Sequence, residues 1–309
     1  MTLPTDPTGR SIAPSQPLAI IIVSYNARGD LERCLTSLHS PPPAIGHEIV
    51  VVDNQSSDGS ADAARRWPGV RVIEAGSNAG FAHANNLGLR ATRSTNVLLL
   101  NSDTIVPAGA IDRLVAELDR EPDVAVVGPR LVDGDGRAEL SFGRMIGPLN
   151  ELRQKRIARS AAVDTLTRRR QHPDWVSGAC LLVRRADADA VGGLDERFFM
   201  YTEDVDFCAA IRARGRQILF TPDVEIVHLR GRSAANAPAA TAHAYRRSQL
   251  AFYEKHHPRW APVLRRDPFL RPSRDAETGS RRSARREWGQ STGRSPVQIG
   301  MHRPPPPGR

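Results

Sequence analysis

The 309-residue chain has an ordinary globular composition, with 40% hydrophobic and 25% charged residues, and a formal net charge of +9. Residues 265–309 hold eleven arginines and four acids, a net charge of +7, which leaves only +2 for residues 1–264. A nearly neutral folded part argues against a dedicated nucleic-acid binder, because such proteins usually carry a basic stripe on their folded surface.

The first half of the chain alternates apolar runs, typical of buried strands, with segments of helical periodicity. Strands are expected at residues 18–23, 48–52, 70–73, 96–100 and 124–127. Helices are expected between them at residues 31–38, 60–67, 81–91 and 108–118. Strands separated by helices of this length predict an α/β fold, with a doubly wound, mostly parallel sheet covered by helices on both faces.

The regular alternation of predicted strands and helices ends in the second half of the chain. Residues 133–173 are polar, and we expect a long excursion or mobile flap there. Further elements are expected as strands at residues 175–183, 218–220 and 224–227 and as helices at 205–214 and 245–256. Residues 1–16 are expected to be a disordered arm and residues 265–309 a disordered Arg/Pro-rich tail, because neither has enough apolar residues to fold.

Polar residues follow four of the predicted strands, at the carboxyl ends where open parallel sheets bind ligands. They are Ser24-Tyr25-Asn26, residues 53–59, residues 76–80 and Asn101-Ser102-Asp103. Neither GxGxxG nor GxxxxGK[ST] occurs here, so a dinucleotide fingerprint and a P-loop are both excluded. A diphosphate bound at this edge would need another counter-charge, and a metal ion is the natural candidate.

Three of the polar residues at strand ends allow both a structural and a functional interpretation. Asp53 can form a turn and cap the next helix, or accept hydrogen bonds from a nucleoside. Asp103 can cap the helix that follows Pro107, or hold a hard divalent cation whose shell is completed by phosphate and water oxygens. His228 ends an apolar strand and could add a nitrogen ligand suited to Mn²⁺, although a histidine in this position is more often structural.

An acidic and aromatic segment, Gly193–Asp206, immediately precedes a predicted helix. Thr202 is a good N-cap, and acids in a first helical turn favour the helix dipole. However, Glu203, Asp204 and Asp206 beside aromatic and Met side chains exceed what capping requires. Such surroundings can raise a carboxyl pKa toward the value useful for a general base.

Six blocks of sequence resemble glycosyltransferase family 2, the inverting enzymes of the GT-A fold, and in particular its bacterial rhamnosyltransferase-type members. The blocks are VSYN (23–26), VVDNQSSDGS (51–60), NAGFAHANNLG (78–88), LLLNSD (98–103), WVSGACLLVRR (175–185) and GGLDERFFMYTEDVDFCAAIRARG (192–215). The resemblance implies that residues 17–130 form a nucleotide-sugar-binding half and residues 131–264 an acceptor-binding and catalytic half.

The resemblance also implies roles for individual residues. Asp204 matches the catalytic base, and Asp53 the acid that contacts the nucleotide base. Asp103 matches the last acid of the metal-binding DxD motif, whose first acid is replaced by Asn101, and His228 is a second ligand for Mg²⁺ or Mn²⁺. The implied donor-binding residues are Ser24, Tyr25, Asn26, Asp53, Asn78, Gly80, Asn85, Asn101, Ser102 and Asp103. The implied acceptor-binding residues are Trp175, Ser177, Gly178 and Glu203.

The implied reaction moves a sugar, with dTDP-rhamnose expected as donor ahead of UDP-sugars, to a saccharide or lipid-linked acceptor in cell-wall or surface polysaccharide synthesis. A sugar-nucleotide nucleotidyltransferase and a non-catalytic carbohydrate-binding protein are the alternatives. The segment VSYNARGD lacks the Gly-rich phosphate loop of the former. Intact acids at positions 103 and 204 argue against the latter.

The expected location is the cytoplasm. No run approaches the roughly 20 apolar residues of a membrane-spanning helix. The cysteines Cys34, Cys180 and Cys208 lack CxxC spacing, which favours buried free thiols in a reducing compartment. The basic tail could lie on an anionic membrane surface at the inner face of the cell membrane, or remain solvated.

Overall fold

The computed structural model describes residues 16–158, 160, 162–229 and 238–266. The chain divides into two compact units, Met1–Pro262 and Val263–Arg309, and the fold described below is that of the first. Almost all of the predicted arm and tail lies outside the described residues.

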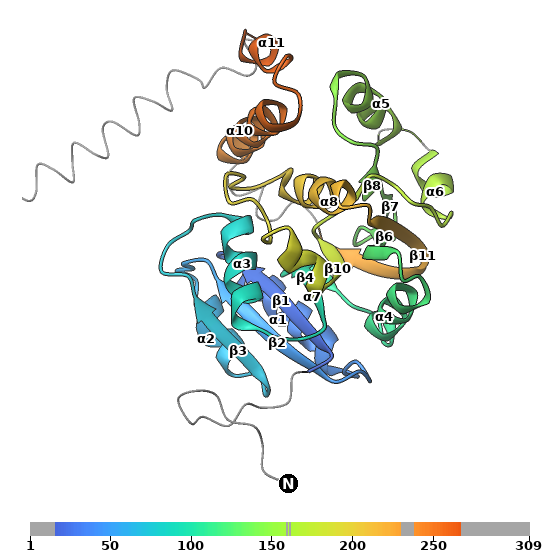
Figure 1. The fold of residues 1–309 in the computed structure, drawn as a ribbon. Helices are drawn as coiled ribbons and strands as arrows, with labels where there is room; N and C mark the ends of the chain where they lie inside the picture. Colours follow the sequence, from blue (N-terminus) through green and yellow to red (C-terminus); the bar gives the residue numbers. More distant parts are fainter. Residues whose placement is uncertain (1–15, 159, 161, 230–237, 267–309) are drawn as a thin grey trace, which may run out of the picture. The chain divides into compact units, whose positions relative to one another are not determined.

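The N-terminal half has the predicted alternation of strands and helices (Figure 1). Its strands are β1 (Leu18–Ser24), β2 (His47–Asp53), β3 (Val70–Glu74) and β4 (Asn96–Asn101). Its helices are α1 (Arg28–His39), α2 (Ser60–Arg65), α3 (Phe81–Ala91) and α4 (Ala110–Arg120). β1 pairs in parallel with β2 and β4, and β2 in parallel with β3.

β1 is buried along its whole length, which explains its continuous apolar sequence. Ile20 and Ile22 enter the core that contains the apolar side chains of α1, such as Leu35. Ile21 and Val23 enter the core on the opposite face, together with the apolar side chains of α3. Successive side chains of a strand point to opposite faces, so one strand organises both cores.

The other strands extend this sheet and make it mixed. They are β5 (Thr104–Ile105), β6 (Val124–Val132), β10 (Cys180–Arg184) and β11 (Gln217–His228), and the order is β3-β2-β1-β4-β10-β6-β11-β5. β10 runs antiparallel to β4 and β6, whereas β11 runs parallel to β6. The predicted α/β fold is confirmed. The direction of β10 could not be predicted, because an apolar run buried on both faces carries no directional signal.

Residues 133–173 are more regular than the expected excursion. They contain β7 (Ala138–Glu139), β8 (Phe142–Gly143), α5 (Pro148–Ala158) and α6 (Ala162–Thr167). β8 pairs with β9 (Trp175–Val176). The single strand expected at 175–183 is therefore broken between β9 and β10, at residues 177–179. The helix α5 escaped prediction because its sequence, PLNELRQKRIA, has no apolar stripe.

The remaining described helices are α7 (Arg185–Ala190), α8 (Glu203–Ala213), α10 (Pro238–His256) and α11 (Ala261–Arg266). Two short strands were expected at 218–220 and 224–227, but β11 is one strand with a pairing irregularity between Thr221 and Glu225. Cys34, Cys180 and Cys208 are buried free thiols, as predicted. Within the described part of the chain, every helix is too short or too polar to cross a membrane.

The packing of α3 on β1 depends on Gly88. A Cβ atom at position 88 would lie 2.5 Å from Cγ2 of Ile21, well inside the roughly 3.5–4.0 Å of a normal carbon contact. We expect Gly88→Ala to lower the free energy of unfolding by about 1–3 kcal/mol, because overpacking outweighs the better helix propensity of alanine.

Gly29→Ala in α1 is the matched control, because a Cβ atom at position 29 would have nothing within 4 Å. It should leave the free energy of unfolding unchanged or raise it by up to about 1 kcal/mol. Urea unfolding of both variants measures the difference. Equal effects would contradict this account of how α3 packs.

Candidate active site

A cavity of about 660 Å³ opens at the carboxyl ends of β1 and β4. Its size is typical of sites that bind small molecules. Most of the predicted site residues line it: Tyr25, Asn78, Gly80, Asn101, Ser102, Asp103, Trp175, Ser177, Gly178, Glu203, Asp204 and His228. The lining does not include Ser24, Asn26, Asp53 and Asn85.

Asn26 and Asp53 shape the loop that follows β2. Oδ1 of Asn26 accepts the backbone N–H of Ser57 at 2.8 Å, and Oδ2 of Asp53 accepts that of Ser56 at 2.9 Å. These bonds correspond to the turn-forming interpretation of Asp53. Its other oxygen, Oδ1, is buried and has no hydrogen-bond partner among the described residues, so an acceptor is left over for a ligand.

Gly80 brings the start of α3 against the loop 199–202. The backbone N–H of Phe81 donates to the carbonyl of Phe199 at 2.7 Å. Gly80 has φ of 100°, and a Cβ atom there would lie 2.4 Å from that carbonyl oxygen, so only glycine permits this approach. Asn78, two residues earlier, accepts the side-chain N–H of Asn54 at 2.8 Å, which fixes the loop before α3.

The loop 199–202 has an unusual backbone. Tyr201 and Thr202 have φ of 70° and 66°, and left-handed conformations of such residues cost on the order of 1–3 kcal/mol each. Thr202 precedes α8, but its hydroxyl makes no capping hydrogen bond. The hydroxyl of Ser248 in α10 donates to the carbonyl of Met200 at 2.7 Å. The loop is thus held by α3 and α10, and it directs the first residues of α8 toward the cavity.

Asp204 accepts two backbone hydrogen bonds inside the cavity. Its Oδ2 accepts the N–H of Gly178 at 2.9 Å, and its Oδ1 accepts the N–H of Val205 at 2.8 Å. Burial raises the pKa of Asp204 in spite of these bonds, which favour the charged form. The pKa of Glu203 is also raised well above its usual range, by burial and by the charge of Asp204.

The third acid of this segment, Asp206, has a different role. Its carboxylate is bound by Lys255 Nζ at 2.8 Å and by His256 Nε2 at 2.6 Å, both at the end of α10. Lys255 Nζ also lies 2.8 Å from Asp195. Asp206 does not line the cavity, and it joins α8 to α10. Among the three acids, only Glu203 and Asp204 remain candidates for chemistry.

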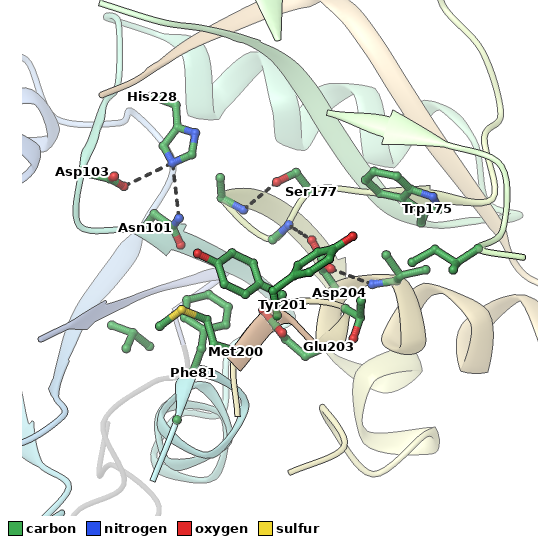
Figure 2. A pocket seen from close by; sticks show the side chains of 18 of the residues that line it. Phe81, Asn101, Asp103, Trp175, Ser177, Met200, Tyr201, Glu203, Asp204 and His228 are labelled. Atoms are coloured by element: carbon green, nitrogen blue, oxygen red, sulfur yellow. Dashed lines mark hydrogen bonds and ion pairs between the residues drawn. The ribbon is translucent and has the colours of Figure 1, made fainter. Parts of the chain in front are cut away.

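Asp103 and His228 lie together on the opposite side of the cavity from Trp175, with Tyr201 and Asp204 between them (Figure 2). His228 Nε2 is 3.3 Å from Asp103 Oδ1, and His228 Nδ1 is 3.2 Å from Glu139 Oε2. Burial lowers the pKa of His228, but the two carboxylates outweigh it and raise the pKa to about 9. The two carboxylates therefore favour the protonated imidazole, which would have to release its proton before Nε2 could bind a metal ion.

Several lining residues were not predicted from the sequence. They are mainly Asn54, Phe81, Leu140, Arg144, Ile146, Asn150, Glu151, Gln154, Met200, Tyr201, Thr202 and Tyr245. Met200, Tyr201 and Thr202 stand in the acidic and aromatic segment and could have been found there. The residues between 140 and 154, and Glu139 behind His228, belong to the polar stretch in which neither a motif nor a period marks a site.

Comparison with known proteins agrees with this geometry. The model of the family "Glycosyl transferase family 2" matches residues 19–190. An N-acetylglucosaminyl-diphospho-decaprenol L-rhamnosyltransferase of Mycobacterium tuberculosis (strain ATCC 25618 / H37Rv) is 32% identical over 296 residues, which cover 87% of this chain and 96% of the relative. A rhamnosyltransferase of Escherichia coli (strain K12) is 25% identical, covering 68% of this chain and 82% of the relative.

The fold also matches a solved structure, a mannosyltransferase from Pyrobaculum calidifontis in complex with GDP-Man and Mn²⁺. The TM-score is 0.56 and the identity 19%, with 95% of this chain and 79% of that chain covered. At this level of identity the match shows a shared fold, the GT-A fold.

Proposed function

This chain belongs to glycosyltransferase family 2, and we propose that it transfers rhamnose from dTDP-rhamnose to a sugar on a lipid diphosphate. UDP-sugars are the second choice of donor. We infer a lipid-linked acceptor because the name of the relative in M. tuberculosis contains one, N-acetylglucosaminyl-diphospho-decaprenol. The product would be an intermediate of cell-wall or surface polysaccharide synthesis. Family membership identifies a glycosyltransferase and excludes the nucleotidyltransferase and the non-catalytic binding protein.

The position of Asp204 carries the proposal. Its carboxylate faces a cavity large enough for a sugar and a diphosphate, and two backbone N–H groups fix its orientation. A base held in this way would accept the proton of an acceptor hydroxyl while that oxygen attacks the anomeric carbon. The new C–O bond forms as the bond to the diphosphate breaks, so the configuration inverts and the nucleoside diphosphate leaves with the electron pair.

The donor would lie between the ends of β1 and β4 and the loop before α3. Tyr25, Asn78 and Gly80 line this part of the cavity, and Oδ1 of Asp53 would accept a hydrogen bond from the nucleoside. The acceptor sugar would lie on the other side, against the indole of Trp175. The turn at Ser177 and Gly178 and the acid Glu203 would border it.

Asp103 and His228 fit the divalent cation, Mg²⁺ or Mn²⁺, that enzymes of this fold use. The carboxylate and the imidazole nitrogen are 3.3 Å apart, and the buried Oδ1 of Asn101 beside them has no partner among the described residues. Within that part of the chain, no three His, Cys, Asp or Glu side chains form a complete site. Diphosphate oxygens would therefore complete the shell, and the ion would neutralise charge on the leaving group.

A donor panel tests the function directly. Purified protein is incubated with dTDP-rhamnose, UDP-glucose, UDP-N-acetylglucosamine or GDP-mannose, an N-acetylglucosaminyl lipid diphosphate, and Mg²⁺ or Mn²⁺. We expect transfer, detected by mass spectrometry of the acceptor, with dTDP-rhamnose above all others. Transfer of another sugar in its place would overturn the choice of donor.

Asp204→Asn should lower kcat by about two to four orders of magnitude, the usual range when a general base is lost. Asp206→Asn is the matched control, because Asp206 pairs with Lys255 and His256 away from the cavity. It should lower the melting temperature and retain most of the turnover per folded molecule. Turnover of the Asp204 variant near the wild-type value would remove Asp204 from the mechanism.

The raised pKa of Asp204 predicts the acid side of the pH profile. The base acts only when ionised, so kcat/KM should fall as pH drops through this pKa. The midpoint should lie above about 3.9, the ordinary value for aspartate. Circular dichroism over the same pH range separates titration from unfolding. A folded enzyme that keeps its full rate down to pH 4 contradicts the assignment.

Asp103→Ala should abolish the metal-dependent part of nucleotide binding. Calorimetric titration with dTDP in Mn²⁺ or in EDTA should show a large difference for the wild type and none for the variant. Asp135→Ala, at an exposed carboxylate, is the control and should keep the difference. If Asp103→Ala also keeps it, the cation lies elsewhere.

A further inference from the structure

Arg144 differs from the other charged residues of the cavity. It is the one lysine or arginine lining the cavity within the described residues. The other lining residues with a carboxylate or an imidazole are Asp103, Glu151, Glu203, Asp204 and His228. An acceptor that carries its own diphosphate would meet mainly carboxylates here, so it needs a fixed positive charge.

The backbone at Arg144 is fixed next to Trp175. The indole N–H of Trp175 donates to the carbonyl of Arg144 at 3.0 Å. The backbone N–H of Asp174 donates to the carbonyl of Gly143 at 2.8 Å, and the carboxylate of Asp174 accepts the backbone N–H of Met145 at 2.7 Å. Arg144 therefore directly follows a two-stranded sheet, β8 paired with β9, on the acceptor side of the cavity.

The guanidinium group itself is loosely held. Its side chain is 74% exposed, and its ion pair with Asp174 spans 3.8 Å. Asp174 already has a closer partner, Arg212, at 2.9 Å. Because the guanidinium group is largely in solvent and the pair is long, it contributes little, and Arg144 can turn to another anion at small cost.

An apolar stretch follows Arg144 in the chain. Ile146 lines the cavity, and Leu149, at the start of α5, is 82% exposed. The carbonyl of Ile146 contacts the ring of His257 at 2.7 Å, and the backbone N–H of Trp260 donates to the carbonyl of His257. The indole of Trp260 is 49% exposed. Arg144, whose backbone is bonded to Trp175, is thus followed in the chain by two apolar side chains, Ile146 in the cavity wall and Leu149 in solvent.

We propose that residues 144–149 bind the lipid-diphosphate part of the acceptor. Arg144 donates charge-assisted hydrogen bonds to the diphosphate, and Ile146 and Leu149 contact the first part of the hydrocarbon chain. The acceptor sugar then lies between Trp175 and Asp204. This inference rests on the proposed function, because it assigns the residues that select a lipid-diphosphate acceptor.

The test compares two soluble acceptors that present the same sugar. One is a short-chain isoprenyl diphosphate sugar, and the other is a neutral alkyl glycoside; no membrane is present. The measured quantity is kcat/KM for the diphosphate acceptor divided by kcat/KM for the neutral acceptor. Arg144→Gln should lower this ratio by about 10- to 100-fold, because a charge-assisted hydrogen bond is lost. Arg144→Lys should restore part of the ratio, since it keeps the charge without the planar fork.

Arg137→Gln is the matched control, since Arg137 is 76% exposed in the same region but does not line the cavity. It should leave the ratio unchanged. An equal loss on both acceptors in Arg144→Gln, or a higher donor KM, would overturn the inference. A wild-type enzyme that transfers to neither acceptor would instead count against the proposed function.

Leu149→Gln tests the apolar part, at a position too exposed to affect folding. In detergent solution, it should lower the preference for a short-chain isoprenyl diphosphate sugar over the methyl diphosphate of the same sugar by about three- to tenfold, because apolar contact with the first part of the chain is lost. An unchanged preference would overturn the role of Leu149.

Discussion

The hydrogen bond between the Gly178 N–H and the Asp204 carboxylate joins the turn between β9 and β10 to the start of α8 at the candidate site. It can form because the strand breaks between β9 and β10, which turns this N–H away from the sheet and toward α8. A Cβ atom on Gly178 would lie 3.3 Å from Cβ of Asp204, so a larger residue would strain the approach. The break, the position of α8 and the orientation of the base therefore depend on one another.

The sequence was sufficient to predict the N-terminal half of the sheet and twelve of the residues that line the cavity. Strands buried on both faces are long apolar runs, and residues such as Asp103 follow them where parallel strands bind ligands. Asp206 shows the limit of this reasoning. Composition and spacing do not separate it from Asp204, because its partner Lys255 comes from a helix about fifty residues later. The resemblance to the family motif singles out Asp204 as the base, and the tertiary structure shows that Asp206 is the ion-paired acid.

The least predictable part of the site is the segment from Glu139 to Gln154. Its helix packs through polar contacts, such as the bond from Gln154 to the carbonyl of Phe142, and so lacks an apolar period. Glu139 acts on His228 from a two-residue strand, too short to show a pattern. Arg144 is one of 41 arginines in the chain, and composition could not single it out. In this segment, the residues of the site are recognised by their tertiary contacts, because no periodic sequence pattern marks them.

Lys255 offers a way to observe one of these contacts chemically. The chain has only two lysines, Lys155 and Lys255, so few primary amines compete for an acylating reagent. The ammonium group of Lys255 lies between Asp195 and Asp206, and these carboxylates hold it in the charged, unreactive form by raising its pKa, although burial opposes this. Slow acylation at this position would report that α10 remains docked on α8, and thus that the support of the loop 199–202 is intact.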